Sequence, residues 1–135
     1  MRRALYDINI ALDVILQREP HFAASAEALR VAERGEVEGY LAGHAVPTLD
    51  YILRREIGPA YDRSVLQDLL SFLRIAPVTD SAVRSALSAD AADFEDAVTS
   101  AVAEESGIDV IVTRDLRGFA GSAVPAETPA TFCSR

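Results

Sequence analysis

Residues 108–112 (Ile-Asp-Val-Ile-Val), followed by residues 113–115 (Thr-Arg-Asp), form the stretch of sequence that decides the fold. Four of the first five residues are large and aliphatic. A near-continuous apolar run of this kind is typical of a parallel strand covered by helices on both faces. We therefore expect a buried parallel strand at residues 108–112, with a hydroxyl, a guanidinium and a carboxylate at its carboxyl end.

Shorter apolar segments precede and follow this strand. Strands are expected at residues 4–6, 37–45 and 75–78, with an edge strand at residues 123–124. Between them, apolar residues recur at helical spacing, and Gly, Pro and capping residues mark the helix ends. The helices predicted from these signals cover residues 8–18, 20–34, 47–57, 64–74, 81–87 and 94–105. Strands that alternate with helices predict an α/β fold with one open, mostly parallel sheet of four to five strands.

The length of 135 residues fits a single domain covering residues 1–135, because domains most often have ~100–150 residues. Half of the residues are hydrophobic, which is typical of a globular chain. Cys133 is the only cysteine, so disulfides do not hold the fold. No apolar run approaches the ~20 residues of a membrane span, and polar residues interrupt the N-terminal apolar segment. These features predict a cytoplasmic protein that does not enter a membrane.

The charge balance excludes several functions. Twenty-one acidic and 13 basic side chains give a formal net charge of −8, and every basic residue is an arginine. Without lysine, Schiff-base catalysis, the phosphate-binding P-loop and receiver-domain phosphorelay are excluded. An acidic chain also binds nucleic acid poorly through its overall charge, because affinity for duplexes comes largely from cationic contacts to phosphate. A nucleic-acid ligand would need local arginines and bound cations.

Carboxylates stand at the predicted strand ends. Asp7 follows the first strand, Asp115 follows the strand at 108–112, and Asp96 lies in the first turn of the preceding helix. Ligands of open α/β sheets bind beyond the carboxyl ends of the strands, so these three side chains are expected at one mouth. Carboxylates that share a pocket repel one another unless a cation neutralises them, and their oxygens suit Mg²⁺ or Mn²⁺. Such a site would activate water for phosphodiester hydrolysis.

The acids also have purely structural interpretations. Asp93 suits a helix N-cap, and Asp96 is favoured in a first helical turn by the helix dipole. Asp115 would serve equally well as the cap of the turn that follows it. Asp7 is harder to explain in this way, because it follows an apolar strand and opens a helix. The residues alone leave both interpretations open.

Three ordered motifs resemble those of PIN-domain proteins. Residues 6–13 (Tyr-Asp-Ile-Asn-Ile-Ala-Leu-Asp) are similar to the family's opening D-x-N-x-x-L-D. Residues 93–97 (Asp-Phe-Glu-Asp-Ala) resemble its D-F-E-D-A helix start, and residues 111–119 (Ile-Val-Thr-Arg-Asp-Leu-Arg-Gly-Phe) resemble its closing strand. Residues 122–125 and 128–132 also fit the family's ending. The resemblance covers nearly the whole chain, in order and at the expected spacing.

This resemblance implies a three-layer α/β/α sandwich similar to the VapC-like toxins of bacterial toxin–antitoxin pairs. Those toxins are metal-dependent endoribonucleases, usually homodimeric, that a cognate antitoxin protein neutralises. Carried over to this chain, the metal ligands for Mg²⁺ or Mn²⁺ are Asp7, Asp96 and Asp115. Asn9 supports the catalytic site, and Thr113 positions a water or a ligand. The expected reaction is RNA hydrolysis that leaves a 5′-phosphate and a 3′-hydroxyl.

The chain departs from the family's pattern at two positions. The family usually carries an acid, often Glu, at the start of the helix after the second strand, where Thr48 stands here. Asp50 lies two residues later, which rotates it by roughly 200° around a helix, so it is expected to face away. Gly118 stands where many relatives have an acid before Phe119. These departures favour an alternative: a catalytically weak or inactive PIN-like module that binds RNA or a protein partner.

Four arginines are candidate contacts to RNA phosphates. Arg114 and Arg117 flank Asp115, and Arg54 and Arg55 follow the helix start near residue 48. For Arg54 and Arg55 an ordinary solvated position is as good an interpretation, and Arg114 could instead pair with a carboxylate in the pocket.

A different α/β hydrolase or phosphatase is the weakest interpretation. A haloacid-dehalogenase-type site would need an acid where Asn9 stands and a lysine that the chain lacks. Neither G-x-G-x-x-G nor G-x-S-x-G occurs, which argues against dinucleotide binding and serine-hydrolase chemistry.

Overall fold

A five-stranded, all-parallel sheet forms the middle of the molecule in the computed structural model, which describes residues 1–91 and 93–134. The strands are β1 (Arg3–Tyr6), β2 (Glu38–Ala42), β3 (Leu73–Ala76), β4 (Val110–Val112) and β5 (Ala126–Glu127), in the spatial order β3-β2-β1-β4-β5. In these described residues, seven α-helices and one 3-10 helix flank the sheet: α1 (Ile8–Ile15), α2 (Phe22–Glu33), α3 (Ala45–Ile57), α4 (Asp62–Leu70), α5 (Asp80–Ser88), α6 (Phe94–Glu105), η1 (Arg117–Phe119) and α7 (Pro129–Cys133).

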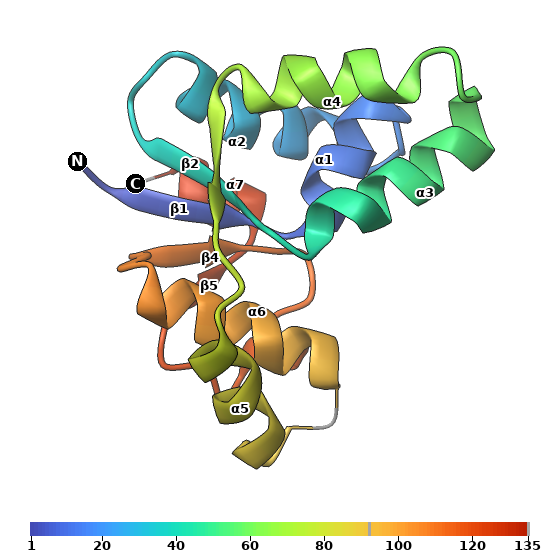
Figure 1. Cartoon of the computed structure of the whole chain (residues 1–135). Coiled ribbons are helices and arrows are strands. Elements are labelled where there is room, and N and C mark those ends of the chain that lie inside the picture. The colour runs from blue at the N-terminus through green and yellow to red at the C-terminus, as the bar shows by residue number, and fades with distance from the viewer. Residues whose placement is uncertain (92, 135) are drawn as a thin grey trace.

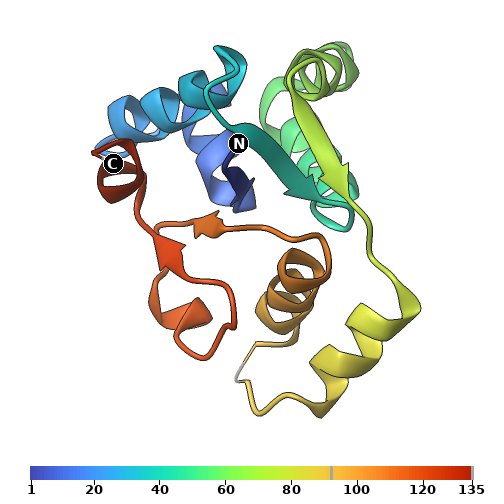
Figure 2. The same ribbon diagram turned by 90° about the vertical axis from the view of Figure 1, so that its left-hand side faces the viewer.

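The sheet separates two hydrophobic cores. Helices α1 to α4 and α7 pack on one face, while α5, α6 and η1 pack on the other (Figure 1, Figure 2). Successive side chains of a strand point to opposite faces, so Ala4 and Tyr6 of β1 enter the first core and Leu5 enters the second. Strand β4 divides in the same way, with Ile111 in the second core. Covering on both faces explains why the run at residues 108–112 is almost entirely apolar.

The predicted α/β fold is confirmed, and the sheet is fully parallel with five strands. The edge strand was misplaced: it lies at Ala126–Glu127, where Ala126 pairs with Ile111, whereas the predicted residues 123–124 precede it. A helix over residues 64–74 was also too long, because α4 ends at Leu70 and Leu73 already pairs with Gly39. An apolar run of that length is compatible with either a helix or a strand, and pairing with β2 decides between them.

Gly39 allows β2 to pack closely against its neighbours. A Cβ atom at this position would lie 2.6 Å from Leu73 Cδ2 and 2.8 Å from Ala32 Cβ. These distances are shorter than any ordinary carbon–carbon contact, so a side chain here would push α2 away from the sheet.

The carboxyl ends of β1, β2 and β4 meet at one edge of the sheet. Helices α1 and α3 begin there, directly after β1 and β2, and the amino end of α6 lies at the same edge (Figure 1). A ligand site is expected at this edge in a parallel sheet. None of the helices in the described part of the chain has the length and apolar character needed to cross a membrane.

Candidate active site

Asp7 and Asp115 are linked through the hydroxyl group of Thr113. The backbone N–H of Asp7 donates to Val112 O at 2.9 Å, which joins the end of β1 to the end of β4. Thr113 is fully buried, and its Oγ1 donates to Asp7 Oδ2 at 2.8 Å. The backbone N–H of Asp115 in turn donates to Thr113 Oγ1 at 3.0 Å. One buried threonine therefore orients both acids.

Asp96 approaches the same place from the amino end of α6. Asp93 caps this helix, and its side chain accepts a hydrogen bond from Asp96 N at 2.9 Å. The backbone N–H of Gly118 donates to Asp115 Oδ1 at 3.1 Å. A Cβ atom on Gly118 would lie 2.5 Å from Asp96 Oδ2 and 2.8 Å from Asp115 Oδ2, so both carboxylates rest against this glycine. Any side chain at position 118 would require one of these carboxylates to move.

Burial and neighbouring carboxylates disfavour the ionisation of Asp7 and of Asp96. Burial raises the pKa of Asp7, and the nearby charge of Asp115 adds to the rise, while the hydrogen bond from Thr113 opposes it. Burial also raises the pKa of Asp96 to about 6, together with the charges of Asp93, Asp7 and Asp115. Like charges that share a partly buried site disfavour ionisation unless a cation is present. The site is therefore electrostatically prepared for a positive ligand.

The donor set fits a hard divalent cation, because all of its ligand atoms are oxygens. Within residues 1–91 and 93–134, no three acidic, histidine or cysteine side chains already stand close enough together to hold a metal ion. An ion would therefore have to draw the carboxylates of Asp7, Asp96 and Asp115 closer together.

Arg114 forms an ion pair with Asp13, the alternative that the sequence left open. Its Nε donates to Asp13 Oδ2 at 2.8 Å and its Nη2 donates to Oδ1 at 3.1 Å. Asp13 is fully buried on α1, and Ser25 Oγ of α2 donates to the same carboxylate at 2.9 Å. The sequence analysis did not identify Asp13 and Ser25 as residues that support the site. Asp13 ends the motif at residues 6–13, and an acid among the apolar residues of a helix indicates that a partner is needed.

The other basic candidates lie on the surface. Arg117 is exposed on η1, and Arg54 and Arg55 are exposed on the last turn of α3. The guanidinium carbon of Arg55 lies 5.7 Å from the ring centre of Tyr51, which is itself 61% exposed. Asn9 is engaged within the fold, because its Oδ1 accepts a hydrogen bond from Arg18 at 3.3 Å.

Thr48 is exposed on the first turns of α3, and its hydroxyl donates at 3.3 Å to the backbone oxygen of His44, the N-cap of that helix. Asp50 is directed elsewhere: a hydrogen bond with Asp62 at the start of α4 raises the pKa of Asp50 and lowers that of Asp62. His44, which precedes α3, has Nε2 within 3.0 Å of Thr99 Oγ1 on α6. The start of α3 is thus joined to α6 one turn after Asp96.

Replacing Arg114 by Ala should lower the free energy of unfolding by about 3 kcal/mol or more, because it leaves the Asp13 carboxylate buried without its partner. Arg84→Ala is the control, since its pair with Asp80 is exposed and should contribute less than about 1 kcal/mol. Urea unfolding measures both. Equal losses for the two variants would contradict the structural importance of the buried pair.

Asp96→Asn should make the metal-free protein more stable at neutral pH. The folded-state pKa of about 6 lies above the unfolded value of 3.8, so ionisation of Asp96 costs stability as pH rises between these values. The expected gain is about 1 kcal/mol at pH 7.5, after allowance for solvent screening, and it should vanish near pH 4. Thermal unfolding in a chelating buffer, with exposed Asp68→Asn as control, tests this. A gain that does not depend on pH would contradict the assignment.

Several solved structures share this fold. FitAcB from Neisseria gonorrhoeae superposes with a TM-score of 0.72 and 18% identity, over 94% of this chain and 98% of that chain. DNA-bound VapBC from Salmonella typhimurium gives 0.70 and 15%, over 96% and 99%. VapC20 of Mycobacterium tuberculosis, described as a toxin that cleaves the sarcin–ricin loop, gives 0.68 and 16%, over 87% and 94%. At these identities the likeness shows the fold alone.

No curated protein matches the sequence. The sequence profile of the PIN domain matches residues 3–117, which include β1 to β4 and all three carboxylates of the candidate site. The match extends over most of the chain and agrees with the strand order and the structural matches. The chain therefore belongs to the PIN domain family.

Proposed function

We propose that this protein is a metal-dependent endoribonuclease that hydrolyses RNA phosphodiester bonds as the toxin of a toxin–antitoxin pair. The meeting of Asp7, Asp96 and Asp115 at one edge of the sheet is the observation that carries the proposal. Their mutual repulsion is relieved by a divalent cation, and a phosphodiester is the substrate class on which such ions commonly act. Membership of the PIN domain family supports the same activity.

The ligands of Mg²⁺ or Mn²⁺ would be Asp7, Asp96 and Asp115. When bound, the ion would lower the pKa of water and offset the charge of the scissile phosphate. The chain's own residues supply the positioning. Thr113 holds Asp7 Oδ2 and the backbone of Asp115, while the cap from Asp93 fixes the first turn of α6, which carries Asp96. Ligands held in this way lose little freedom when the substrate arrives.

Exposed arginines would contact the phosphates of the RNA backbone. Arg117 lies two residues after Asp115 and would contact phosphates near the cleaved bond, whereas Arg54 and Arg55 lie on the last turn of α3 and would contact more distant phosphates. The rest of the acidic surface would weaken indiscriminate binding. Arg114 forms an ion pair with Asp13, so it would support the site and would not contact RNA.

The proposed partners are RNA, a cognate antitoxin protein and a second copy of the chain, in the cytoplasm. Support comes from relatives of the same fold, since the FitAB and VapBC structures are complexes bound to DNA, and another is a toxin–antitoxin complex from Klebsiella pneumoniae.

A PIN-like module that binds RNA or protein without cutting is the second candidate. Thr48 favours it, because its hydroxyl donates to the backbone of His44 at the start of α3 and its side chain supplies no fourth carboxylate. Gly118 favours it too, because many members of the family have an acid at this position before Phe119. Fewer negative charges would bind a metal more weakly, and a site without a tightly held metal would cleave slowly.

Purified protein should cut a mixed RNA pool with Mg²⁺ or Mn²⁺ and should stop when a chelator is added. Asp7→Asn or Asp96→Asn should reduce the rate by about 100-fold or more, because each removes a charged metal ligand. Asp68→Asn, on the exposed face of α4, should cut at the parent rate. Cleavage by Asp7→Asn at the parent rate would disprove the site, and no cleavage with any metal would favour the binding module.

Thr48→Glu should tighten Mn²⁺ binding by about 10-fold, because it restores a carboxylate at the start of α3. Thr48→Gln is the matched control, since it has the same length without the charge. Isothermal titration of Mn²⁺ into each protein gives the affinities. If the Glu and Gln variants bind Mn²⁺ equally, Thr48 does not occupy the position of the usual acid.

A further inference from the structure

One face of α3 leads from the candidate site to the surface. Four residues, spaced by four, three and four positions, lie within roughly 60° of one another around the helix: His44, Thr48, Tyr51 and Arg55. We call these four residues the α3 stripe. Leu53, on the opposite side of the helix, is fully buried, whereas the last three members of the stripe are exposed. The α3 stripe therefore faces solvent along most of its length.

The α3 stripe begins beside one of the three carboxylates. Thr99 follows Asp96 by three residues on α6, which places the two side chains on one face of that helix. His44 Nε2 lies 3.0 Å from Thr99 Oγ1, and the Thr48 hydroxyl donates to His44 O at 3.3 Å. From Thr48 to Arg55 the helix then rises by roughly 10 Å. A strand of RNA that leaves the site along α3 would thus pass the α3 stripe.

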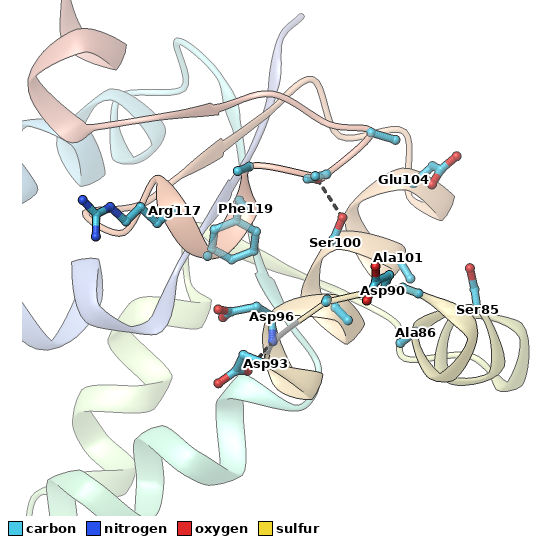
Figure 3. A pocket seen from close by; sticks show the side chains of 18 residues that line it. Ser85, Ala86, Asp90, Asp93, Asp96, Ser100, Ala101, Glu104, Arg117 and Phe119 are labelled. Atoms are coloured by element: carbon cyan, nitrogen blue, oxygen red, sulfur yellow. Dashed lines mark hydrogen bonds between the residues drawn. The ribbon is translucent and has the colours of Figure 1, made fainter.

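The side of the site toward α5 is unsuited to a phosphate backbone. A groove of about 480 Å³ lies there between α5, α6 and η1, and its lining includes four acids: Asp90, Asp93, Asp96 and Glu104. Among the described residues that line the groove, Arg117 is the only basic one, and its guanidinium extends away from the other side chains (Figure 3). A phosphate in the groove would therefore meet carboxylates and no cation.

Arg55 presents a cation that has no acidic partner. Its guanidinium carbon lies 5.7 Å from the ring centre of Tyr51, and it forms no ion pair within residues 1–91 and 93–134. Arg54 is turned by about 100° from Arg55 around the helix, and its charge is close enough to act on Asp50 and Asp62. In a chain with a formal net charge of −8, the unpaired cation of Arg55 favours an anionic partner.

The ring of Tyr51 indicates which anionic partner fits. Tyr51 is 61% exposed, although an aromatic ring of this size is usually covered in a folded protein. Unpaired bases stack on aromatic rings and on guanidinium planes, and the stack tolerates any base because every base has a flat face. An acidic peptide would neutralise Arg55 without needing the ring. A nucleotide uses both groups, since its base matches Tyr51 and its phosphate matches Arg55.

We propose that the α3 stripe binds an unpaired nucleotide of the substrate RNA, with the base stacked on Tyr51 and a phosphate against Arg55. In a duplex, each base is already stacked between its neighbours, so the α3 stripe selects a single strand. Tyr51 and Arg55 are positioning residues, because they hold the strand at a distance from the reacting phosphate. This inference rests on the proposed function and specifies its substrate as RNA that is single-stranded beside the cleaved bond.

Binding of an oligonucleotide tests the α3 stripe without any cleavage. The probe is a short, labelled RNA of mixed sequence, either single-stranded or annealed to its complement, in a chelating buffer at low salt. Fluorescence anisotropy gives the affinity. We expect the single strand to bind more tightly than the duplex. The ring NMR signals of Tyr51 should shift when the single strand is added, because a stacked base lies directly against the ring.

Variants of the α3 stripe separate stacking from charge. Tyr51→Ala should weaken binding of the single strand by about 10-fold, and Tyr51→Phe should retain the parent affinity because it keeps the ring. Arg55→Gln should weaken binding and lower the slope of log affinity against log salt by about one, as expected for one lost phosphate contact.

Two matched controls should bind RNA like the parent protein. Tyr61→Ala removes a tyrosine that is 65% exposed but lies beyond the end of α3. Arg84→Gln removes an exposed arginine of α5, in the other helical layer.

Three results would overturn the proposal. The first is equal affinity of the parent and Tyr51→Ala for the single strand. The second is a change in oligomeric state of Tyr51→Ala at unchanged RNA affinity, which would make the α3 stripe a contact between copies of the chain. The third is binding of a polyglutamate peptide as tightly as RNA, lost in Arg55→Gln and retained in Tyr51→Ala.

Cleavage kinetics distinguish this inference from the nuclease itself. Tyr51→Ala should raise KM for a single-stranded substrate by about 10-fold at unchanged kcat, because the stack is equally strong before and during the reaction. Metal-dependent cutting with the parent KM in Tyr51→Ala would refute the α3 stripe and leave the nuclease intact. Binding that depends on Tyr51, without cutting under any metal, would support the α3 stripe and reject the nuclease.

Discussion

The parallel pairing of β1 with β4 is the contact on which the candidate site depends. Tyr6 pairs with Val112, and the backbone N–H of Asp7 extends this ladder by donating to Val112 O. This register brings Thr113 Oγ1 to within 2.8 Å of Asp7 Oδ2, although the two residues are 106 positions apart. A slip of one residue would turn Thr113 to the opposite face of the sheet and separate Asp115 from Asp7.

The same arrangement places like charges together, which opposes folding in the absence of a cation. Thr113 Oγ1 holds Asp7 and the backbone of Asp115, and the N–H of Gly118 donates to the Asp115 carboxylate. The side chain of Asp93 caps the first turn of α6, which carries Asp96. The buried pair of Arg114 with Asp13 fixes the segment after β4 against α1. A cation bound at this edge would relieve the repulsion among the carboxylates, and the positive charge would then let an acidic protein bind a polyanion locally.

Much of the fold could be predicted from hydrophobic patterning. Strand β4 and the last three residues of β1 are buried, and these residues are correspondingly apolar, whereas the first residue of β1, Arg3, is exposed. The edge strand β5 has two half-buried residues, Ala126 and Glu127, and therefore carries no such signal. Leu73 illustrates the other limit, because its apolar neighbours fit a helix as well as a strand until the backbone of β2 is available for pairing.

The sequence by itself determined the chemistry of the mouth: acids at the ends of two parallel strands and in the first turn of a late helix, in an order that resembles PIN domains. Only the tertiary structure decided which of these acids lie close enough to interact electrostatically, because the distances among Asp7, Asp96 and Asp115 depend on sheet register and on Gly118. It also decided that Arg114 pairs with the buried carboxylate of Asp13. Such contacts join segments distant in sequence, and local patterns of hydrophobicity and charge do not encode them.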